Sequence, residues 1–76
     1  MTSKEIGNII LQHRKAGDLT RNELAELAGV GKTVVFNIEK GKETVQLNSI
    51  LKVLKVLNIK ILLVSPLNKF NKDANS

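Results

Sequence analysis

The residues that first suggest chemistry are Gly31-Lys32-Thr33, a tripeptide that also ends the phosphate loop of many nucleotide-binding proteins. That loop has a glycine five positions before the Gly-Lys-Thr and follows a strand. Here the position five before Gly31 is Glu26, and the lead-in "NELAELA" has the pattern of a helix. A chain of 76 residues also has little room for the sheet around a buried nucleotide. The sequence therefore argues against an ATP site.

Catalytic and metal-binding groups are also hard to assemble from this sequence. The chain has no cysteine, so it offers no disulfide and no thiolate ligand. Its one histidine, His13, has no second ligand at metal-binding spacing, and Asp18 and Glu43 form no recognisable carboxylate pair. We therefore predict a protein that is not an enzyme and that uses no metal or cofactor.

The charge of the chain indicates an acidic partner. Its formal net charge is +5 and its pI is about 9.8, which in a small domain favours nucleic acid, although the same charge also serves ordinary solubility. No signal-peptide pattern opens the chain, and its longest apolar stretch is too short to span a membrane. We expect a cytoplasmic protein with no membrane partner.

Four helices follow from capping residues and apolar spacing. Thr2 with Glu5, and Thr20 with Glu23, have the spacing of capping boxes. The predicted helices occupy 2–17, 20–29, 31–41 and 47–58. Their predicted inner faces contain Ile6, Ile9, Ile10, His13, Leu24, Leu27, Ala28, Val35, Ile38, Leu47, Ile50, Leu51, Leu54 and Leu57.

The second and third of these helices meet at the short turn "AGVG", residues 28–31. Two short helices joined by a tight turn containing glycine form a helix-turn-helix unit, whose second helix enters the major groove of DNA. If Val35 and Ile38 pack back onto the preceding helix, the outward side chains are Lys32, Thr33, Phe36 and Asn37. An outward Phe36 has two open interpretations, contact with a thymine methyl group or contact with a partner protein.

The stretch "LTRNELAELAGVGKTVVFNIEKGK", Leu19 to Lys42, resembles the XRE-type helix-turn-helix family of phage repressors and bacterial regulators. The resemblance extends over about 6–57 and implies a compact all-helical domain that binds DNA as a two-fold dimer. It places Lys32, Thr33 and Asn37 at base-reading positions. The chain departs from the family pattern at Gly31, where serine or threonine is usual, and at Phe36, where a polar residue is usual.

The same resemblance implies further roles. Arg21 stands where the family contacts phosphate at the start of its second helix, and Thr20 is a helix cap whose hydroxyl or amide is a further candidate for phosphate contact. Lys40 and Lys42 match the loop that grips the DNA backbone. Arg14 and Glu39 match a structural pair that ties the first helix to the end of the third.

The stretch "IKILLV", residues 59–64, changes to a β-branched and aliphatic pattern that predicts a strand, closed by Pro66. A helix running directly into such a strand resembles the HipB-like antitoxins, in which the strand pairs with its copy in a second subunit. The predicted dimerisation residues are Ile59, Ile61, Leu62, Leu63 and Val64. One face of the strand is expected to cover Val53 and Val56. The alternative is that 59–64 simply extends the fourth helix.

The predicted fold class is thus all-α: a four-helix DNA-binding domain, 1–66, with a C-terminal strand pairing across a homodimer, and a polar, disordered tail, 67–76. The predicted function is a repressor that binds a palindromic operator in double-stranded DNA. The narrower resemblance implies an antitoxin that also binds a HipA-like kinase toxin. Two alternatives are a stand-alone phage-type repressor and a toxin-neutralising interaction module with little DNA binding.

Overall fold

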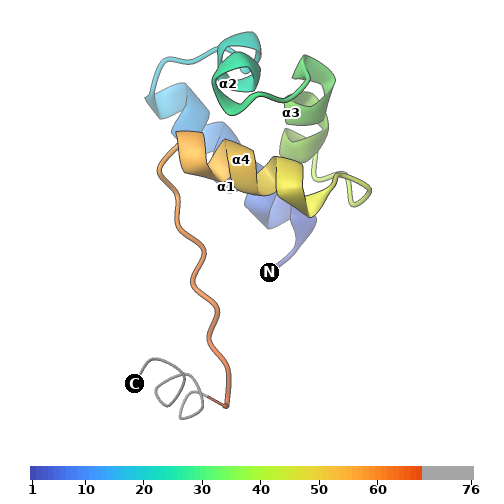
Figure 1. The fold of residues 1–76 in the computed structure, drawn as a ribbon, viewed down its shortest axis with the longest axis vertical. Helices are drawn as coiled ribbons and strands as arrows, with labels where there is room; N and C mark the ends of the chain where they lie inside the picture. The colour runs from blue at the N-terminus through green and yellow to red at the C-terminus, as the bar shows by residue number, and fades with distance from the viewer. Residues whose placement is uncertain (68–76) are drawn as a thin grey trace.

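The computed structural model describes residues 1–67 and contains four helices within them (Figure 1). Their bounds are α1 (Ser3–Ala16), α2 (Arg21–Ala28), α3 (Lys32–Glu39) and α4 (Leu47–Val56). No residue from 1 to 67 lies in a β-strand. The prediction of four helices is therefore confirmed, and helix bounds agree with the predicted ones to within about two residues.

Both predicted capping boxes are present. At the start of α1 the Thr2 hydroxyl accepts a hydrogen bond from the Glu5 amide, while the Glu5 carboxylate accepts one from the Thr2 amide. Thr20 and Glu23 repeat this arrangement at the start of α2. Each box satisfies backbone N–H groups that a helix start leaves without an internal partner, which fixes where the two helices begin.

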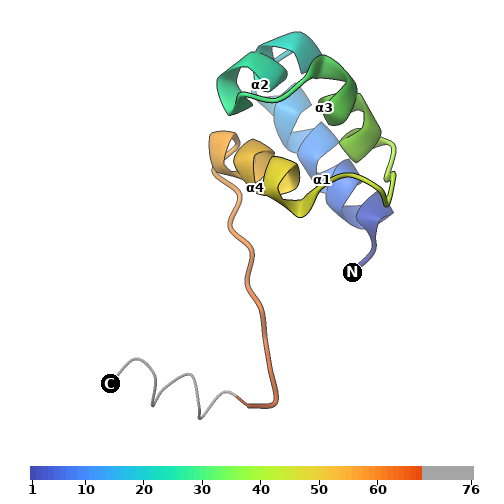
Figure 2. The same cartoon turned by 45° about the vertical axis from the view of Figure 1, so that its right-hand side comes forward.

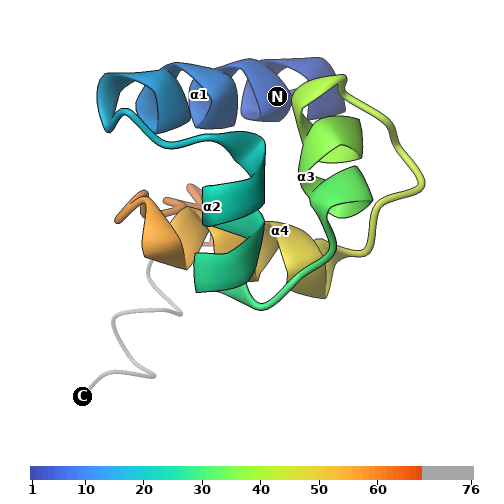
Figure 3. The same ribbon diagram turned by 90° about the horizontal axis from the view of Figure 1, so that it is seen from above.

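The four helices bury a small aliphatic core. α2 packs against both α3 and α4, and α1 packs against α3. Figure 3 shows α2 set between α1 and α4, with α3 joined to α2 by a short turn. The buried apolar residues are Ile10, Leu24, Ala25, Val35, Ile38, Val53 and Leu54. Isoleucine, leucine and valine fill this core because the described part of the chain contributes only one aromatic residue, Phe36.

The prediction of which residues face the core is wrong at several positions. Leu27 is 63% exposed, and the other predicted inner-face residues that are exposed are Ile9, His13, Leu47 and Leu51. Val53, by contrast, is fully buried within the single chain. Successive helical residues are about 100° apart, so in α4 the stripe of leucines and the stripe of valines are neighbouring faces of one helix. The core-facing arc contains Val53 and Leu54, one residue from each stripe. Val53 therefore needs no cover from a strand, contrary to the expectation.

The chain after α4 runs away from the bundle without forming a helix or a strand (Figures 1 and 2). Ile59 still belongs to the helical body, residues 2–59, because it is half-buried against the core and its amide donates to the Leu54 carbonyl. We call residues 60–67 the C-terminal arm. The alternative that 59–64 extends α4 is wrong, since the helix ends at Val56 and Asn58 has a φ of 58°. The predicted tail, 67–76, lies outside the described residues apart from Leu67.

Candidate nucleic-acid interface

The corner between α2 and α3 is a tight turn fixed by backbone geometry. Gly29 has a φ of 71°, in the left-handed region that glycine adopts without strain, and it ends α2. The Val30 amide donates to the Ala25 carbonyl at 3.0 Å, and Val30 packs against the core. Gly31 then starts α3 with no side-chain cap. The turn therefore sets α3 at a defined angle to α2, as a helix-turn-helix requires.

One side of α3 faces the core and the opposite side faces outward. Val35 and Ile38 are buried against Leu24 of α2 and the rest of the core. Lys32, Thr33 and Phe36 are exposed, and Asn37 is half-buried. At about 100° per residue these four side chains occupy an arc opposite the buried pair. The helix thus presents lysine, threonine, phenylalanine and asparagine on one continuous outer face.

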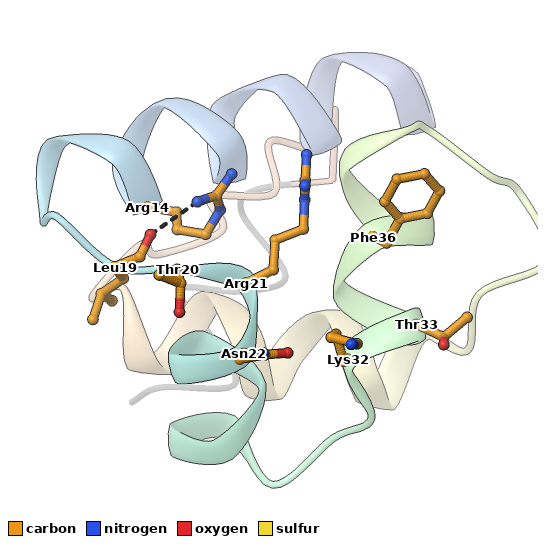
Figure 4. Close-up of a pocket in the computed structure, with 8 residues that line it drawn as sticks. All are labelled: Arg14, Leu19, Thr20, Arg21, Asn22, Lys32, Thr33 and Phe36. Atoms are coloured by element: carbon orange, nitrogen blue, oxygen red, sulfur yellow. Dashed lines mark hydrogen bonds between the residues drawn. The ribbon is translucent and has the colours of Figure 1, made fainter.

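An open cleft runs between the start of α2 and the start of α3 (Figure 4). It brings together two predicted phosphate-contacting residues, Thr20 and Arg21, and three of the predicted base-reading residues. Its lining residues are Arg14, Leu19, Thr20, Arg21, Asn22, Lys32, Thr33 and Phe36. Donor groups from both helices of the motif therefore face the same space.

Asn37 faces a different groove from the other outward residues of α3. This groove lies between α3 and the loop leading to α4, and it is lined by Val34, Asn37, Thr44, Val45, Gln46 and Ser49. Sequence reasoning missed its other polar members, Thr44, Gln46 and Ser49, and it also missed Asn22 in the first cleft. The available signal was a run of polar residues before α4, where Gln46 starts the helix without capping it by its side chain.

Lys40 and Lys42 flank the turn that ends α3. Lys40 is the capping residue of α3, and both lysines are exposed. Between them Gly41 has a φ of 78° and lies against Lys4 of α1, while the Lys42 amide donates to the Asn37 carbonyl at 3.0 Å. The backbone that carries the two lysines is therefore held against the body, although their ammonium groups extend from it.

A three-residue ion network joins the first three helices. The Arg14 Nε donates to Glu39 Oε2 at 2.6 Å, and its Nη2 donates to Glu39 Oε1 at 3.2 Å. Its Nη1 donates to the Leu19 carbonyl at 2.8 Å, drawn as a dashed line in Figure 4. This is the predicted pair between α1 and the end of α3. The Glu39 side chain is only 3% exposed, so the carboxylate is nearly enclosed.

Arg21, which was predicted as a phosphate contact, also belongs to this network. Its Nε donates to Glu39 Oε1 at 2.9 Å. Its guanidinium carbon lies 5.4 Å from the centre of the Phe36 ring, and the Lys40 ammonium lies 5.3 Å from the same point. Figure 4 shows the Arg21 side chain between Arg14 and Phe36. The Glu39 carboxylate therefore binds Arg14 and Arg21, and the Phe36 ring contacts Arg21 and Lys40.

Two further observations concern metal ions and membranes. Residues 1–67 contain no group of three or more His, Cys, Asp or Glu side chains placed to hold a metal ion. Among the helices described, none is long and apolar enough to cross a bilayer.

Comparison with known proteins agrees with the geometry of the α2–α3 corner. A family model described as helix-turn-helix matches residues 10–64. An uncharacterised HTH-type transcriptional regulator, y4mF of Sinorhizobium fredii, is 37% identical over 65 residues, which cover 86% of each chain.

Solved structures with the same fold include chains from a "HipB-O4 20mer complex" and from a "Structure of HipA-HipB-O2-O3 complex". Each has a TM-score of 0.78 and 21% sequence identity, and the match covers 87% of this chain and 93% of the other. At that identity the likeness shows the fold.

Proposed function

Because this chain belongs to the XRE-type helix-turn-helix family of transcriptional regulators, we propose that it is a sequence-specific DNA-binding repressor. The observation that carries the proposal is the outer face of α3, where Lys32 and Thr33 line the basic cleft shared with α2 and Asn37 lines the adjoining groove toward the α3–α4 loop. Placed in the major groove, lysine donates to guanine O6 and N7, and asparagine offers the donor and acceptor that suit adenine. Thr33 donates or accepts through its hydroxyl.

The surrounding groups supply affinity that does not depend on sequence. Thr20, Arg21, Lys40 and Lys42 lie around the same motif, at the start of α2 and the end of α3. In the free chain the Thr20 hydroxyl accepts from the Glu23 amide, which leaves its own proton for a phosphate oxygen. Cations at these positions displace counterions from DNA, so binding weakens steeply as salt rises.

The experiment that tests DNA binding compares two variants on two duplexes, one from the region upstream of the protein's own gene and one of random sequence. Asn37→Ala should weaken the upstream duplex by roughly 1–3 kcal/mol and spare the random one, because it removes a base contact. Lys42→Ala should weaken both similarly, because it removes a phosphate contact. Equal losses on both duplexes for Asn37→Ala would remove that residue from base reading.

The C-terminal arm supports a dimer as the acting form. Residues 61–64 carry four exposed aliphatic side chains, and a lone extended segment leaves its backbone donors and acceptors unpaired. In the proposed dimer, 59–64 pairs antiparallel with its copy about a two-fold axis, with Ile61, Leu62, Leu63 and Val64 as its contacts and Ile59 as its anchor in the body. Two copies of α3 would then enter major grooves about 34 Å apart.

Sedimentation of the intact chain, of Leu62→Asp and of a chain ending at Lys60 tests the dimer. Ending at Lys60 keeps Ile59, whose packing belongs to the body. Both variants should sediment as monomers and bind a palindromic duplex much more weakly than the intact chain. Persistence of the dimer in either variant at micromolar concentration would reject the arm as the interface.

The narrower part of the proposal is that the protein is an antitoxin whose partner is a HipA-like kinase toxin. It draws support from the fold shared with the HipB chain of the HipA-HipB-O2-O3 complex, and from apolar side chains that the body leaves exposed. Co-expression with a kinase-like protein encoded beside it should relieve that protein's toxicity and yield a stable complex. Relief without operator binding would favour an interaction module instead, and operator binding without any such partner would favour a stand-alone repressor.

A further inference from the structure

We propose that Phe36 is a positioning residue, which holds Arg21 and Lys40 on the DNA-facing surface, and that it does not read a base. The inference rests on the proposed DNA binding. Its starting observation is that two cations from different parts of the chain converge on one ring: Arg21 is the first residue of α2, and Lys40 caps the end of α3. Their charged groups lie 5.4 and 5.3 Å from the ring centre. Both distances fall within the range of cation–π attraction, about 6 Å.

The ring is held in place although it is on the surface. Phe36 is 42% exposed, so part of it packs against the protein. Its neighbours in α3, Val35 and Ile38, are buried, which prevents the helix from turning the ring elsewhere. The backbone between ring and lysine is also fixed, because the Lys40 amide donates to the Phe36 carbonyl at 3.0 Å. The ring is therefore a rigid platform between the two cations.

Arg21 keeps most of its donors available in this position. Its Nε–H is used by the Glu39 carboxylate at 2.9 Å, and Glu39 is itself fixed by the buried Arg14. A guanidinium has five N–H groups, so the two Nη nitrogens retain four for an incoming anion. The Phe36 ring and the Glu39 carboxylate together fix the orientation of the Arg21 guanidinium. Less side-chain entropy is therefore lost when the guanidinium binds a phosphate.

The electrostatics of the site favour an anion on the solvent side of the two cations. Arg21 and Lys40 repel one another, and the negative face of the ring offsets part of that repulsion. Among residues 1–67, the carboxylate paired with arginine here is that of Glu39, and it faces two guanidiniums. The cluster of Arg14, Arg21, Lys40 and Glu39 thus carries an excess of positive charge. A DNA phosphate would neutralise this excess, whereas a thymine methyl group approaching the ring would have to displace a cation.

The test compares Phe36→Leu, which keeps an apolar side chain without a π face, with Phe36→Trp, which keeps the face. Affinities for the operator and for a random duplex of equal length are measured over a range of salt. Phe36→Leu should weaken both about three- to tenfold, leave their ratio unchanged and make the salt dependence shallower. Phe36→Trp should stay within about twofold of the original protein. A loss confined to the operator, or no loss at all, would overturn the proposal.

An NMR measurement on the free protein separates this inference from DNA binding itself. Ring currents from Phe36 should shift the Arg21 side-chain protons and the Lys40 ε protons upfield, and Phe36→Leu should abolish both shifts. If these protons are unshifted in the original protein, Phe36 does not hold the two cations, even if DNA binds normally. Failure of the original protein to bind any duplex would overturn the proposed function, and with it the assignment of these cations to DNA phosphates.

Discussion

The helical body and the C-terminal arm use the same aliphatic residues with opposite results. In the body Ile10, Leu24, Val35 and Val53 are completely buried, whereas in the arm Leu62 and Leu63 are each 85% exposed. The difference comes from neighbours, because the core residues of the body form one apolar cluster drawn from all four helices. The arm runs out from the bundle, and only its first apolar residues, Ile61 and Leu62, line an apolar hollow with Ile6 and Ile9 of α1 and Leu54 of α4. The body buries a core of its own apolar side chains, whereas the apolar side chains of the arm require another surface to cover them.

The two regions also differ in how their polar groups are satisfied. In the body the starts of α1 and α2 are capped by side chains, and the part of the chain that the structure describes has no buried side-chain polar atom without a hydrogen bond. The arm has no ladder of backbone hydrogen bonds. Changes in the body should therefore alter the stability of the single chain, and changes in the arm should alter association. Four sets of variants test this division, from the largest expected effect to the smallest.

Glu39→Ala should have the largest effect on the body. It removes the partner of a buried guanidinium, and breaking one side of a buried pair costs about 3–5 kcal/mol. The matched control is Arg21→Ala, which should cost under about 1 kcal/mol because that side chain is 42% exposed. Thermal unfolding measures both. Similar melting temperatures for the two variants would mean that Arg14 does not depend on the carboxylate.

Leu24→Ala and Leu62→Ala remove the same atoms from the two regions. Leu24→Ala should destabilise the chain by about 2–5 kcal/mol, since it leaves a cavity in the core. Leu62→Ala should change the unfolding free energy by no more than about 0.5 kcal/mol where the chain is monomeric. Urea denaturation at low and high protein concentration measures both. A large loss for Leu62→Ala in the monomer would show that the arm packs on its own body.

Gly7→Ala tests how closely α1 approaches the end of α3. A Cβ at Gly7 would overlap the Ile38 carbonyl, so the helices must separate, at a cost of about 1–3 kcal/mol. Gly17→Ala is the control, because a Cβ there makes only ordinary contacts and the φ of −89° suits alanine. Chemical denaturation should leave Gly17→Ala within about 0.5 kcal/mol of the original protein. Tolerance of Gly7→Ala would indicate a looser body than the structure has.

Gly29→Ala should have the smallest effect on stability. It tests the cost of backbone strain alone, because a Cβ at this position would not clash with any neighbouring atom. A Cβ at Gly29 meets no atom within 4 Å, but its φ of 71° is left-handed, so alanine should cost about 1 kcal/mol. Gly29→Asn should cost less, because asparagine tolerates this region. The two variants are compared by melting temperature. Equal losses would point to a cause other than the torsion angle.

Local features of the sequence predicted the fold better than the orientation of its faces. The two capping boxes and Gly29 act within a few residues, so they fixed the helix bounds. Periodicity did not settle which residues of a wide apolar stripe are buried. In the two-turn α2, Leu24, Ala25 and Ala28 occupy the core arc and leave Leu27 outside it. Which side of α4 is buried depends on where α2 lies, and that is a tertiary property.

The candidate site shows the same limit. Lys32, Thr33 and Phe36 were predictable as outward residues, because Val35 and Ile38 define the buried side of α3. The bond from Arg21 to Glu39 spans 18 positions, and the approach of Arg21 to Phe36 depends on the angle between α2 and α3. No spacing rule within one helix encodes either contact. The pairing of 59–64 between two chains stays a prediction, since it requires a second copy.

The single carboxylate shared by Arg14 and Arg21 constrains the order in which this protein can change by mutation. Replacing Glu39 first strands a buried charge, whereas replacing Arg14 first leaves the carboxylate still bonded to Arg21. Effects at these three positions should therefore be non-additive, and the same substitutions should be tolerated in one sequence of steps and harmful in another. If evolution were to replace this ion network with apolar residues, the first substitution would be expected at Arg14 of α1. Only after that change could Glu39 be replaced without leaving a buried guanidinium unpaired.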